Sequence, residues 1–278
     1  MGTIVTIEIV DAETPAHDRE RDAAIARAFD WFREVETTCT RFDESSELMR
    51  LCRVTEIATP VSEILFAATE TALAVAEASG GAFDPTAGHF RSVALDAEAR
   101  TITLVRPVQL DLNAVAKGLA VDLAVRELRP FANFVVDAGG DLYASGHNAH
   151  GDPWRIGIRH PAIDREVIAT IDVSGAAICT SGNYERRDVS DAPGHIVNPK
   201  TGAVAEGALS ATVVAASAML ADAMSTAAFV IGGADGLAFL ERHSADGLLV
   251  TRDLEVLATP NMFRTYGLNA GAPILPHA

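Results

Sequence analysis

The sequence predicts an α+β fold built as one intertwined unit. With 49% hydrophobic residues, a chain of 278 residues can bury a full core. Its strand-like runs do not alternate strictly with helical patterns, which disfavours a doubly wound parallel sheet. No internal repeat, low-complexity run or long linker marks a boundary, so we expect a single domain over residues 1–278.

The first half of the chain carries helical patterns. After an opening strand, residues 16–35 place apolar side chains at the spacing of a helix with one buried face, namely Ile25, Phe29, Phe32 and Val35. Ser45-Ser46-Glu47 indicates the start of a short helix, and Ser62 can cap a longer one that runs to Ala78. Gly80-Gly81 then ends that helix.

Strand-like runs dominate the second half. Short apolar strings separated by turn residues occupy 101–105, 134–136, 154–158, 167–173 and 176–179. Between the first two, residues 114–128 repeat apolar positions at helical spacing, and Pro130 stops this helix. Residues 213–232 have the length of a membrane-spanning helix. The central Asp222 and the alanine-rich composition instead favour a strand that runs into a buried helix.

The charge balance limits the partners that we expect. With 22 Lys plus Arg against 38 Asp plus Glu, the formal net charge is -16, and no basic stripe is present that would neutralise a polyphosphate backbone. We therefore expect no nucleic-acid partner. Binding of an anionic ligand would require a metal ion, a few placed cations or helix N-termini that reverse the field locally.

The cysteines and the N-terminus bear on the cellular compartment. Cys39, Cys52 and Cys179 are scattered, without a neighbouring Cys or His at ligand spacing, so we expect small buried side chains rather than disulfides or a zinc site. The chain opens with a strand pattern and shows no charged leader before an apolar run. We expect a cytoplasmic protein without a membrane span.

Several polar segments have both a structural and a ligand-binding interpretation. Residues 80–86 place two glycines at a helix end and Asp84 before a proline, as in a helix cap followed by a turn, yet the backbone amides there can also face a ligand. Residues 137–141 form a tight strand connection whose glycines turn the chain or admit a ligand closely. The polar loops 179–187 and 195–202 are further places where sites are commonly built.

Asp111, Asn113 and Lys117 surround the predicted start of the helix over 114–128. A helix start can hold a phosphate through its free N–H groups and its dipole, with Lys117 adding a point charge. The alternative is that Asp111 or Asn113 is only an N-cap and that Lys117 lies on a solvated face.

Asp222, Ser225 and Thr226 stand at positions i, i+3 and i+4, so on a helix their side-chain oxygens point from one face. A carboxylate and two hydroxyls suit a hard cation such as Mg²⁺, which prefers oxygen ligands. Alternatively, a buried Asp222 is only paired or hydrogen-bonded. The spacing leaves both interpretations open.

Taken in order, these segments resemble the FAD:protein FMN transferase family, often called ApbE-like, over nearly the whole chain. Each segment is weak by itself, whereas seven in series are specific. The series consists of Met1-Gly2-Thr3, Arg41-Phe42 with Ser46-Glu47-Leu48, Gly81 to Pro85, Asp111-Leu112 through Lys117-Gly118, Asp137 to Asp141, Thr180-Ser181-Gly182 with Tyr184-Glu185, and His195 to Gly202. The segment from Ala221 to Thr226 completes the pattern.

The resemblance implies mainly antiparallel sheets with flanking helices, and it implies two sets of site residues. The residues expected around FAD are Met1, Phe42, Ala82, Phe83, Asp84, Asp111, Lys117, His195 and Ile196. The metal would be held by the backbone carbonyl of Ala114 and the side chains of Asp222 and Thr226, with Ser225 at a position where relatives supply a further oxygen.

The implied activity is Mg²⁺-dependent transfer of the FMN moiety of FAD to a Ser or Thr hydroxyl of a target flavoprotein, with release of AMP. Asp222 or Asp111 would accept the hydroxyl proton, and His195 would stand beside the flavin or its phosphates. Two residues depart from the common pattern: Phe42 stands where many relatives have Tyr, and Asn198 replaces an acidic residue. The alternatives are a Mg²⁺-dependent FAD pyrophosphatase and a non-catalytic FAD-binding protein.

Overall fold

The fold is built on a large central sheet. The computed structural model describes residues 3–10, 15–183, 196–270 and 274–276. Eight strands form the sheet in the order β1-β5-β6-β9-β10-β11-β12-β14, and neighbours are antiparallel except for the parallel pair β12 and β14. Their bounds are Val5–Ile9 (β1), Phe134–Ala138 (β5), Asp141–Ser145 (β6), Ala176–Gly182 (β9), Ser210–Ala215 (β10), Asp246–Val250 (β11), Val256–Ala258 (β12) and Ile274–Pro276 (β14). The predicted α+β class with mainly antiparallel sheets is confirmed.

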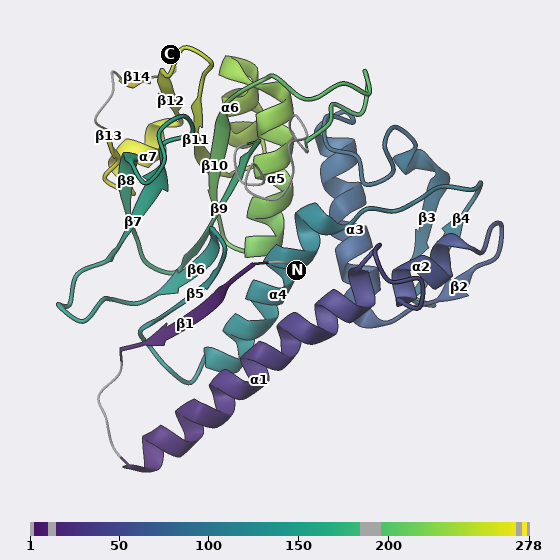
Figure 1. Ribbon diagram of the computed structural model, residues 1–278, viewed down its shortest axis with the longest axis horizontal. Helices are drawn as coiled ribbons and strands as arrows, with labels where there is room; N and C mark the ends of the chain where they lie inside the picture. Colours follow the sequence, from purple (N-terminus) through teal and green to yellow (C-terminus); the bar gives the residue numbers. More distant parts are fainter. Residues whose placement is uncertain (1–2, 11–14, 184–195, 271–273, 277–278) are drawn as a thin grey trace.

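Two three-stranded sheets accompany the large one. The sheet β13-β8-β7 covers one face of it, since Trp154 and Ile171 share a hydrophobic cluster with Val214 and Leu248. The sheet β2-β4-β3 lies beside α2 and α3, away from the large sheet (Figure 1). The bounds are Thr59–Pro60 (β2), Val93–Asp96 (β3), Thr101–Leu104 (β4), Trp154–Arg159 (β7), Val167–Val173 (β8) and Asn269–Ala270 (β13).

Helices cover the other face of the large sheet. Figure 1 shows α4 and α5 at the centre of the molecule, with the long helix α1 running along α4 and with α3 on the side away from the sheet. The bounds are Pro15–Cys39 (α1), Glu47–Cys52 (α2), Glu63–Ala78 (α3), Asn113–Leu128 (α4), Ala218–Ile231 (α5), Gly233–Arg242 (α6), Pro260–Arg264 (α7) and Phe90–Ser92 (the 3-10 helix η1).

Local signals placed several helix ends correctly. Ser46 and Ser62 each accept a hydrogen bond from the backbone N–H three residues on, as the N-caps of α2 and α3. Helix α3 ends at Ala78, and the following Gly80 and Gly81 have φ angles of 60° and 80°, in the left-handed region that favours glycine. The structural interpretation of this segment, a helix cap followed by a turn, is therefore confirmed.

Residues 213–232 form a strand followed by a buried helix, as predicted. Strand β10 ends at Ala215, and Ser217 caps α5 by accepting a hydrogen bond from Leu220 N at 3.2 Å. Within the part of the chain that the structure describes, no helix is long and apolar enough to cross a bilayer.

Strand β9 is longer than the sequence suggests. The predicted strand over 176–179 continues to Gly182, because Thr180 and Ser181 pair in register with Thr212 and Ala211 of β10 at the middle of the sheet. Their hydroxyl groups ended the apolar run in the sequence. The backbone ladder nevertheless continues through them, and this extension places Ser181 inside the molecule.

Candidate functional site

One glycine and one aspartate on α4 set the position of α5. A Cβ atom on Gly118 would lie 2.3 Å from the carbonyl oxygen of Ala218, so only glycine lets the two backbones approach this closely. Four residues later, the Asp122 carboxylate accepts hydrogen bonds from Ala218 N at 2.7 Å and from Met219 N at 3.0 Å. Asp122 thus satisfies two free N–H groups in the first turn of α5 and holds that turn against α4.

The same contacts set the relative direction of α4 and α5. Asp122 accepts hydrogen bonds from N–H groups at the start of α5, whereas Gly118, four residues earlier on α4, contacts the carbonyl of Ala218. The carbonyl lies farther along α5 than the N–H groups, so the two helices run in opposite directions. Ala114 lies one turn before Gly118 on α4, and Asp222 lies one turn after Ala218 on α5. Ala114 also departs from helical geometry, with φ of -89° and ψ of 16°, where a regular helix has ψ of about -42°. Its carbonyl is therefore turned out of line with the helix axis.

Helix α5 presents its three predicted oxygen-bearing residues as a partly buried face. Asp222 is 6% exposed and Ser225 is fully buried, whereas Thr226 is half-buried. Ser181 on β9 joins them, with its Oγ 2.7 Å from Ser225 Oγ and 3.0 Å from Thr226 Oγ1. Ser225 Oγ in turn donates to the carbonyl oxygen of Asp222 at 2.8 Å. The spacing correctly predicted one helix face, and the structure adds a hydroxyl from the sheet.

Lys117 pairs with an aspartate buried beneath α4. Its Nζ lies 2.7 Å from Asp141 Oδ2, and the Asp141 side chain is 1% exposed. Burial raises the pKa of Asp141, and the Lys117 ammonium opposes that rise. The interpretation of Lys117 as a residue on a solvated face is therefore wrong, because its side chain crosses to the start of β6 and neutralises a buried charge.

Cys179 lies next to this group and is buried. Burial, followed by the charges of Asp141 and Asp222, raises the pKa of the Cys179 thiol well above its usual range. The thiol stays protonated, and its Sγ lies 3.4 Å from the carbonyl oxygen of Ala218. Cys39 is likewise buried and Cys52 partly buried, and all three cysteines are free, as the sequence predicted.

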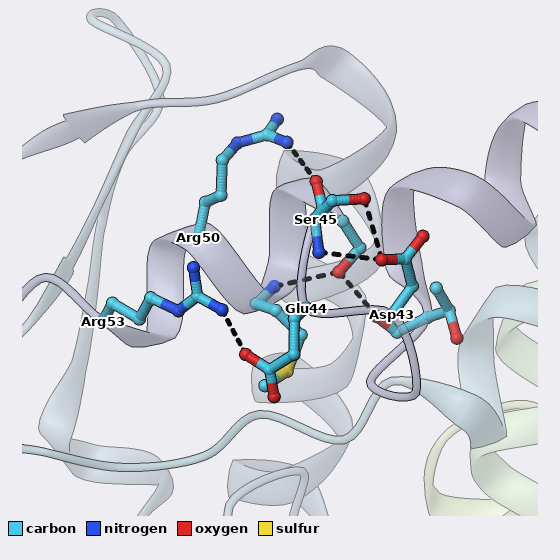
Figure 2. Close-up of polar contacts among 8 residues, drawn as sticks. Asp43, Glu44, Ser45, Arg50 and Arg53 are labelled. Carbon is cyan, nitrogen blue, oxygen red and sulfur yellow. Dashed lines mark hydrogen bonds and ion pairs between the residues drawn. The ribbon is translucent and has the colours of Figure 1, made fainter.

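A second part of the site surrounds the exposed ring of Phe42, whose side chain is 75% exposed. Figure 2 shows the turn that follows it, where Asp43 Oδ1 accepts hydrogen bonds from the backbone N and the hydroxyl of Ser45, at 2.8 and 2.7 Å. Arg50 donates to the Ser45 carbonyl, and Arg53 pairs with Glu44. The turn is thus fixed on α2 by polar contacts, and it holds a large apolar ring out in solvent.

Arg41 links this ring to two distant segments of the chain. Its guanidinium carbon lies 5.0 Å from the centroid of the Phe42 ring, and its Nε lies 3.4 Å from Asp111 Oδ2. The Asp111 N–H donates to the carbonyl of Pro85 at 2.7 Å, and Asp111 Oδ1 accepts from Asn113 N at 3.0 Å. Leu112 occupies the cap position of α4, so the prediction that Asp111 or Asn113 is the N-cap is wrong by one residue. The carboxylate still bonds to an N–H at the helix start.

The turn at residues 82–84 lies next to Pro85, whose carbonyl accepts the hydrogen bond from Asp111. Ala82 and Phe83 are buried, and Asp84 uses its carboxylate to accept from the N–H and the hydroxyl of Thr86 at 2.7 and 2.6 Å. These bonds fix the turn that connects α3 to the residues before η1, so Asp84 has a structural task whatever ligand is bound.

The loop over 196–202 packs against the residues that follow this turn. The carbonyl oxygen of Pro199 lies 3.4 Å from where a Cβ on Gly88 would stand, and the N–H of Ile196 donates to Asn183 Oδ1 at 3.1 Å. Ile196 itself is buried in the main hydrophobic core. An open cavity of about 670 Å³ borders Ala82 and reaches this loop and α6.

Two of the predicted site residues lie outside the described residues. These are Met1 and His195, and the segment Tyr184-Glu185 is likewise outside them. Their predicted places beside FAD stay predictions.

The oxygen-bearing residues predicted on α4 and α5 are of the chemical type that suits a hard cation. In the described ranges, no group of three or more His, Cys, Asp or Glu side chains could hold a metal ion, so a site built on such side chains alone is not found there. Asp222, Thr226 and the turned-out carbonyl of Ala114 instead offer only oxygen, the ligand atom that Mg²⁺ prefers. A site of this kind leaves positions for water or phosphate oxygens on the ion.

Sequence reasoning assigned no role to five residues that build this region: Arg41, Gly118, Asp122, Asp141 and Ser181. Four of them fall inside the segments that carry the family resemblance, whereas Asp122 lies four residues beyond the segment that ends at Gly118. What was missing was the tertiary contact of each, because no spacing rule relates β9 to α5 or Lys117 to the start of β6.

Comparison with protein families matches the ApbE family to residues 1–101 and 89–249. The curated FAD:protein FMN transferase of Salmonella typhimurium is 28% identical over 302 residues, covering 93% of this chain and 84% of that protein. The FAD:protein FMN transferase of Vibrio cholerae is 32% identical over 188 residues, covering 65% of this chain and 54% of that protein. The matched part thus spans about half the length of the Vibrio cholerae relative.

Solved structures share the same architecture. An ApbE protein from Thermotoga maritima has a TM-score of 0.79 and 26% identity, over 91% of this chain and 95% of that one. The flavin transferase ApbE from Vibrio cholerae has a TM-score of 0.82 and 24% identity, over 96% of each chain. At that identity the second likeness concerns the fold alone.

Proposed function

The chain belongs to the ApbE family, and on that premise we propose that it transfers the FMN half of FAD to a Ser or Thr hydroxyl of a target flavoprotein and releases AMP. Its relatives in Salmonella typhimurium and Vibrio cholerae are FAD:protein FMN transferases. The observation that carries this activity to the present chain is the α4–α5 crossing. In this crossing, Gly118 of α4 packs on Ala218 of α5, Lys117 is paired with Asp141, and Asp222 and Thr226 follow one and two turns after Ala218.

The FAD contacts that we propose form two groups. Phe42 offers an exposed ring for stacking, and Arg41 and Asp111 tie it to the turn at residues 82–84. Lys117 and the positive end of the α4 dipole supply positive potential for phosphate. Ala82, Phe83, Asp84 and Ile196 complete the described set, and Met1 and His195 are predicted members beyond it.

We propose that Mg²⁺ is held by the Ala114 carbonyl and by the side chains of Asp222 and Thr226. Ser225 remains a candidate ligand. Its proton is used in the bond to the Asp222 carbonyl, so a contact with the ion would use an oxygen lone pair. A bound Mg²⁺ supplies charge neutralisation for the pyrophosphate and the leaving AMP. This also offers an explanation of how a protein of net charge -16 accommodates an anionic substrate.

The transfer is an in-line displacement at phosphorus. The acceptor oxygen forms a bond to the phosphorus on the FMN side, and the bond from that phosphorus to the bridging oxygen breaks, so that AMP leaves with the electron pair. The hydroxyl proton passes to a carboxylate, for which Asp222 and Asp111 are the two candidates. Lys117 stabilises the phosphate charge, and Asp141 fixes the position of its ammonium group.

Two alternatives use parts of the same site. In a pyrophosphatase, water replaces the acceptor hydroxyl, and the products are free FMN and AMP. A non-catalytic FAD-binding protein would keep Phe42 and the turn at residues 82–84. It would have no need for Asp222 and Thr226, so the presence of this pair on α5 supports an enzyme.

Product analysis separates the three functions. The purified protein is incubated with FAD and Mg²⁺, with and without candidate flavoproteins. AMP and FMN are measured by chromatography, and the acceptor is measured by intact mass. We expect AMP in amounts equal to the covalent FMN on the acceptor. AMP with equal free FMN regardless of acceptor would identify a pyrophosphatase, and unchanged FAD in every mixture would contradict catalysis.

We also propose that residues 1–278 form one domain. The large sheet takes β1 from the start of the chain and β14 from its end, so the two ends contribute to a single structural unit.

A further inference from the structure

The hydroxyl groups of Thr226, Ser181 and Ser225 form a hydrogen-bonded chain that ends at the carbonyl oxygen of Asp222. The donor in each hydrogen bond of this chain follows from that carbonyl, which can only accept. The carbonyl oxygen of Asp222 can only accept, so the Ser225 hydroxyl is the donor in their 2.8 Å contact. A hydroxyl carries one proton. In the 2.7 Å contact between Ser181 and Ser225, the donor is therefore Ser181.

The same reasoning extends to Thr226. The single proton of Ser181 is used toward Ser225, so in the 3.0 Å contact between Ser181 and Thr226 the donor is Thr226. Its proton then points into the protein toward the sheet. The lone pairs of Thr226 Oγ1 are left facing away from Ser181, on the one residue of the three that is not buried.

We propose that Ser181 is a positioning residue that turns the Thr226 hydroxyl so that its lone pairs face the cation. The inference rests on the proposed function, because the cation is the one proposed for α4 and α5. Without Ser181, the Thr226 proton is free to rotate outward, where it would oppose a positive ion. Partners that orient metal ligands through such hydrogen bonds influence metal affinity although they do not touch the metal.

The strand geometry supplies a matched control. Successive side chains of β9 point to opposite faces of the sheet, so Ser181 faces α5 while Thr180 faces the other way. Thr180 also takes part in a hydroxyl–hydroxyl contact, at 2.9 Å to Thr212 of β10. Thr180→Ala therefore removes a similar contact from the same strand without touching the helix that carries Asp222.

The test measures metal affinity apart from turnover. Binding of Mn²⁺, as a probe for Mg²⁺, is followed by electron paramagnetic resonance of the free ion, without FAD. The Mg²⁺ concentration for half-maximal FAD cleavage is measured in parallel. We expect Ser181→Ala to weaken both by about tenfold or more, with turnover recovering at high Mg²⁺. Thr180→Ala should leave both at the wild-type values, and Ser181→Thr, which keeps the hydroxyl, should restore most of the affinity.

The outcomes distinguish this inference from the proposed function. If Ser181→Ala does not fold, Ser181→Cys is used, since it has nearly the same size and a weaker donor, and we expect the same direction of change. A folded Ser181→Ala or Ser181→Cys variant with wild-type metal affinity would overturn the inference alone, as would an equal loss in Thr180→Ala. A wild-type protein that binds no Mn²⁺ and cleaves no FAD would overturn the proposed function and the inference together.

Discussion

Replacing Gly118 by alanine probes the contact that positions the whole site. The added Cβ would stand 2.3 Å from the carbonyl oxygen of Ala218 and 2.6 Å from the Met219 Cα, where ordinary contacts begin at 3.4 Å. Both neighbours are backbone atoms, which cannot rotate away. The helices α4 and α5 must therefore separate by roughly 1 Å to restore a normal contact.

The expected stability change is the balance of two effects. Alanine favours a helix over glycine by about 1 kcal/mol, whereas overpacking costs about 1–3 kcal/mol, and a backbone clash belongs at the upper end of that range. The net loss is about 2 kcal/mol, which lowers the melting temperature by about 3–4 °C in a protein of 278 residues. Moving Asp222 by 1 Å relative to Ala114 should reduce FAD cleavage by about 10²-fold.

A second glycine provides the control. Gly236 on α6 also packs on α5, where an added Cβ would lie 2.9 Å from the Ala228 carbonyl oxygen, but this contact is at the end of α5 remote from Asp222. Gly236→Ala should lower the melting temperature while leaving the Mg²⁺ dependence unchanged. Calorimetry and an FAD-cleavage assay over a Mg²⁺ series check both variants. A Gly118→Ala protein with wild-type stability and metal dependence would refute the close crossing of α4 and α5.

The remaining predictions concern FAD binding. Phe42→Ala should weaken FAD binding by about 10-fold, since stacking of one ring on a base contributes about 1–3 kcal/mol, whereas Phe42→Tyr should keep the wild-type affinity. Flavin fluorescence titration measures the affinity of each protein for FAD. Equal affinities of the wild type, Phe42→Ala and Phe42→Tyr would exclude stacking. Lys117→Ala should lower the melting temperature, because it leaves Asp141 as a buried charge without its partner, at a cost of about 3 kcal/mol. In the double variant Lys117→Ala with Asp141→Asn, the melting temperature should recover but the FAD affinity should stay low. Recovery of both the melting temperature and the FAD affinity would assign Lys117 a purely structural role.

The sequence was most informative where a local signal decides the structure. Ser62 and the glycines after Ala78 bounded α3 at the observed residues, because capping needs only a side chain and a few neighbouring N–H groups. The spacing of Asp222, Ser225 and Thr226 predicted one helix face for the same reason, since the period of a helix is fixed by its backbone.

Contacts between distant segments were beyond this kind of reasoning. Ser181 belongs to a segment that carries the family resemblance, yet its position against α5 depends on β9 extending through two polar residues. From the sequence alone, Lys117 suits a solvated helix face as well as a phosphate site. Only the position of Asp141 beneath α4 rules out the solvated face. In both cases the decisive partner lies on another element, and its distance is set by how α4 and α5 pack on the sheet.

The role of Asp222 is the point on which the magnesium-dependent chemistry depends. Asp222→Asn keeps the size of the side chain and most of its hydrogen bonding but removes the charge that attracts the cation. FAD cleavage and melting temperature are measured on the same preparations of wild type and variant across a Mg²⁺ series. We expect turnover to fall by about 10²-fold or more, with partial rescue at high Mg²⁺ and little change in melting temperature. A destabilised variant with normal, metal-independent turnover would contradict the magnesium site.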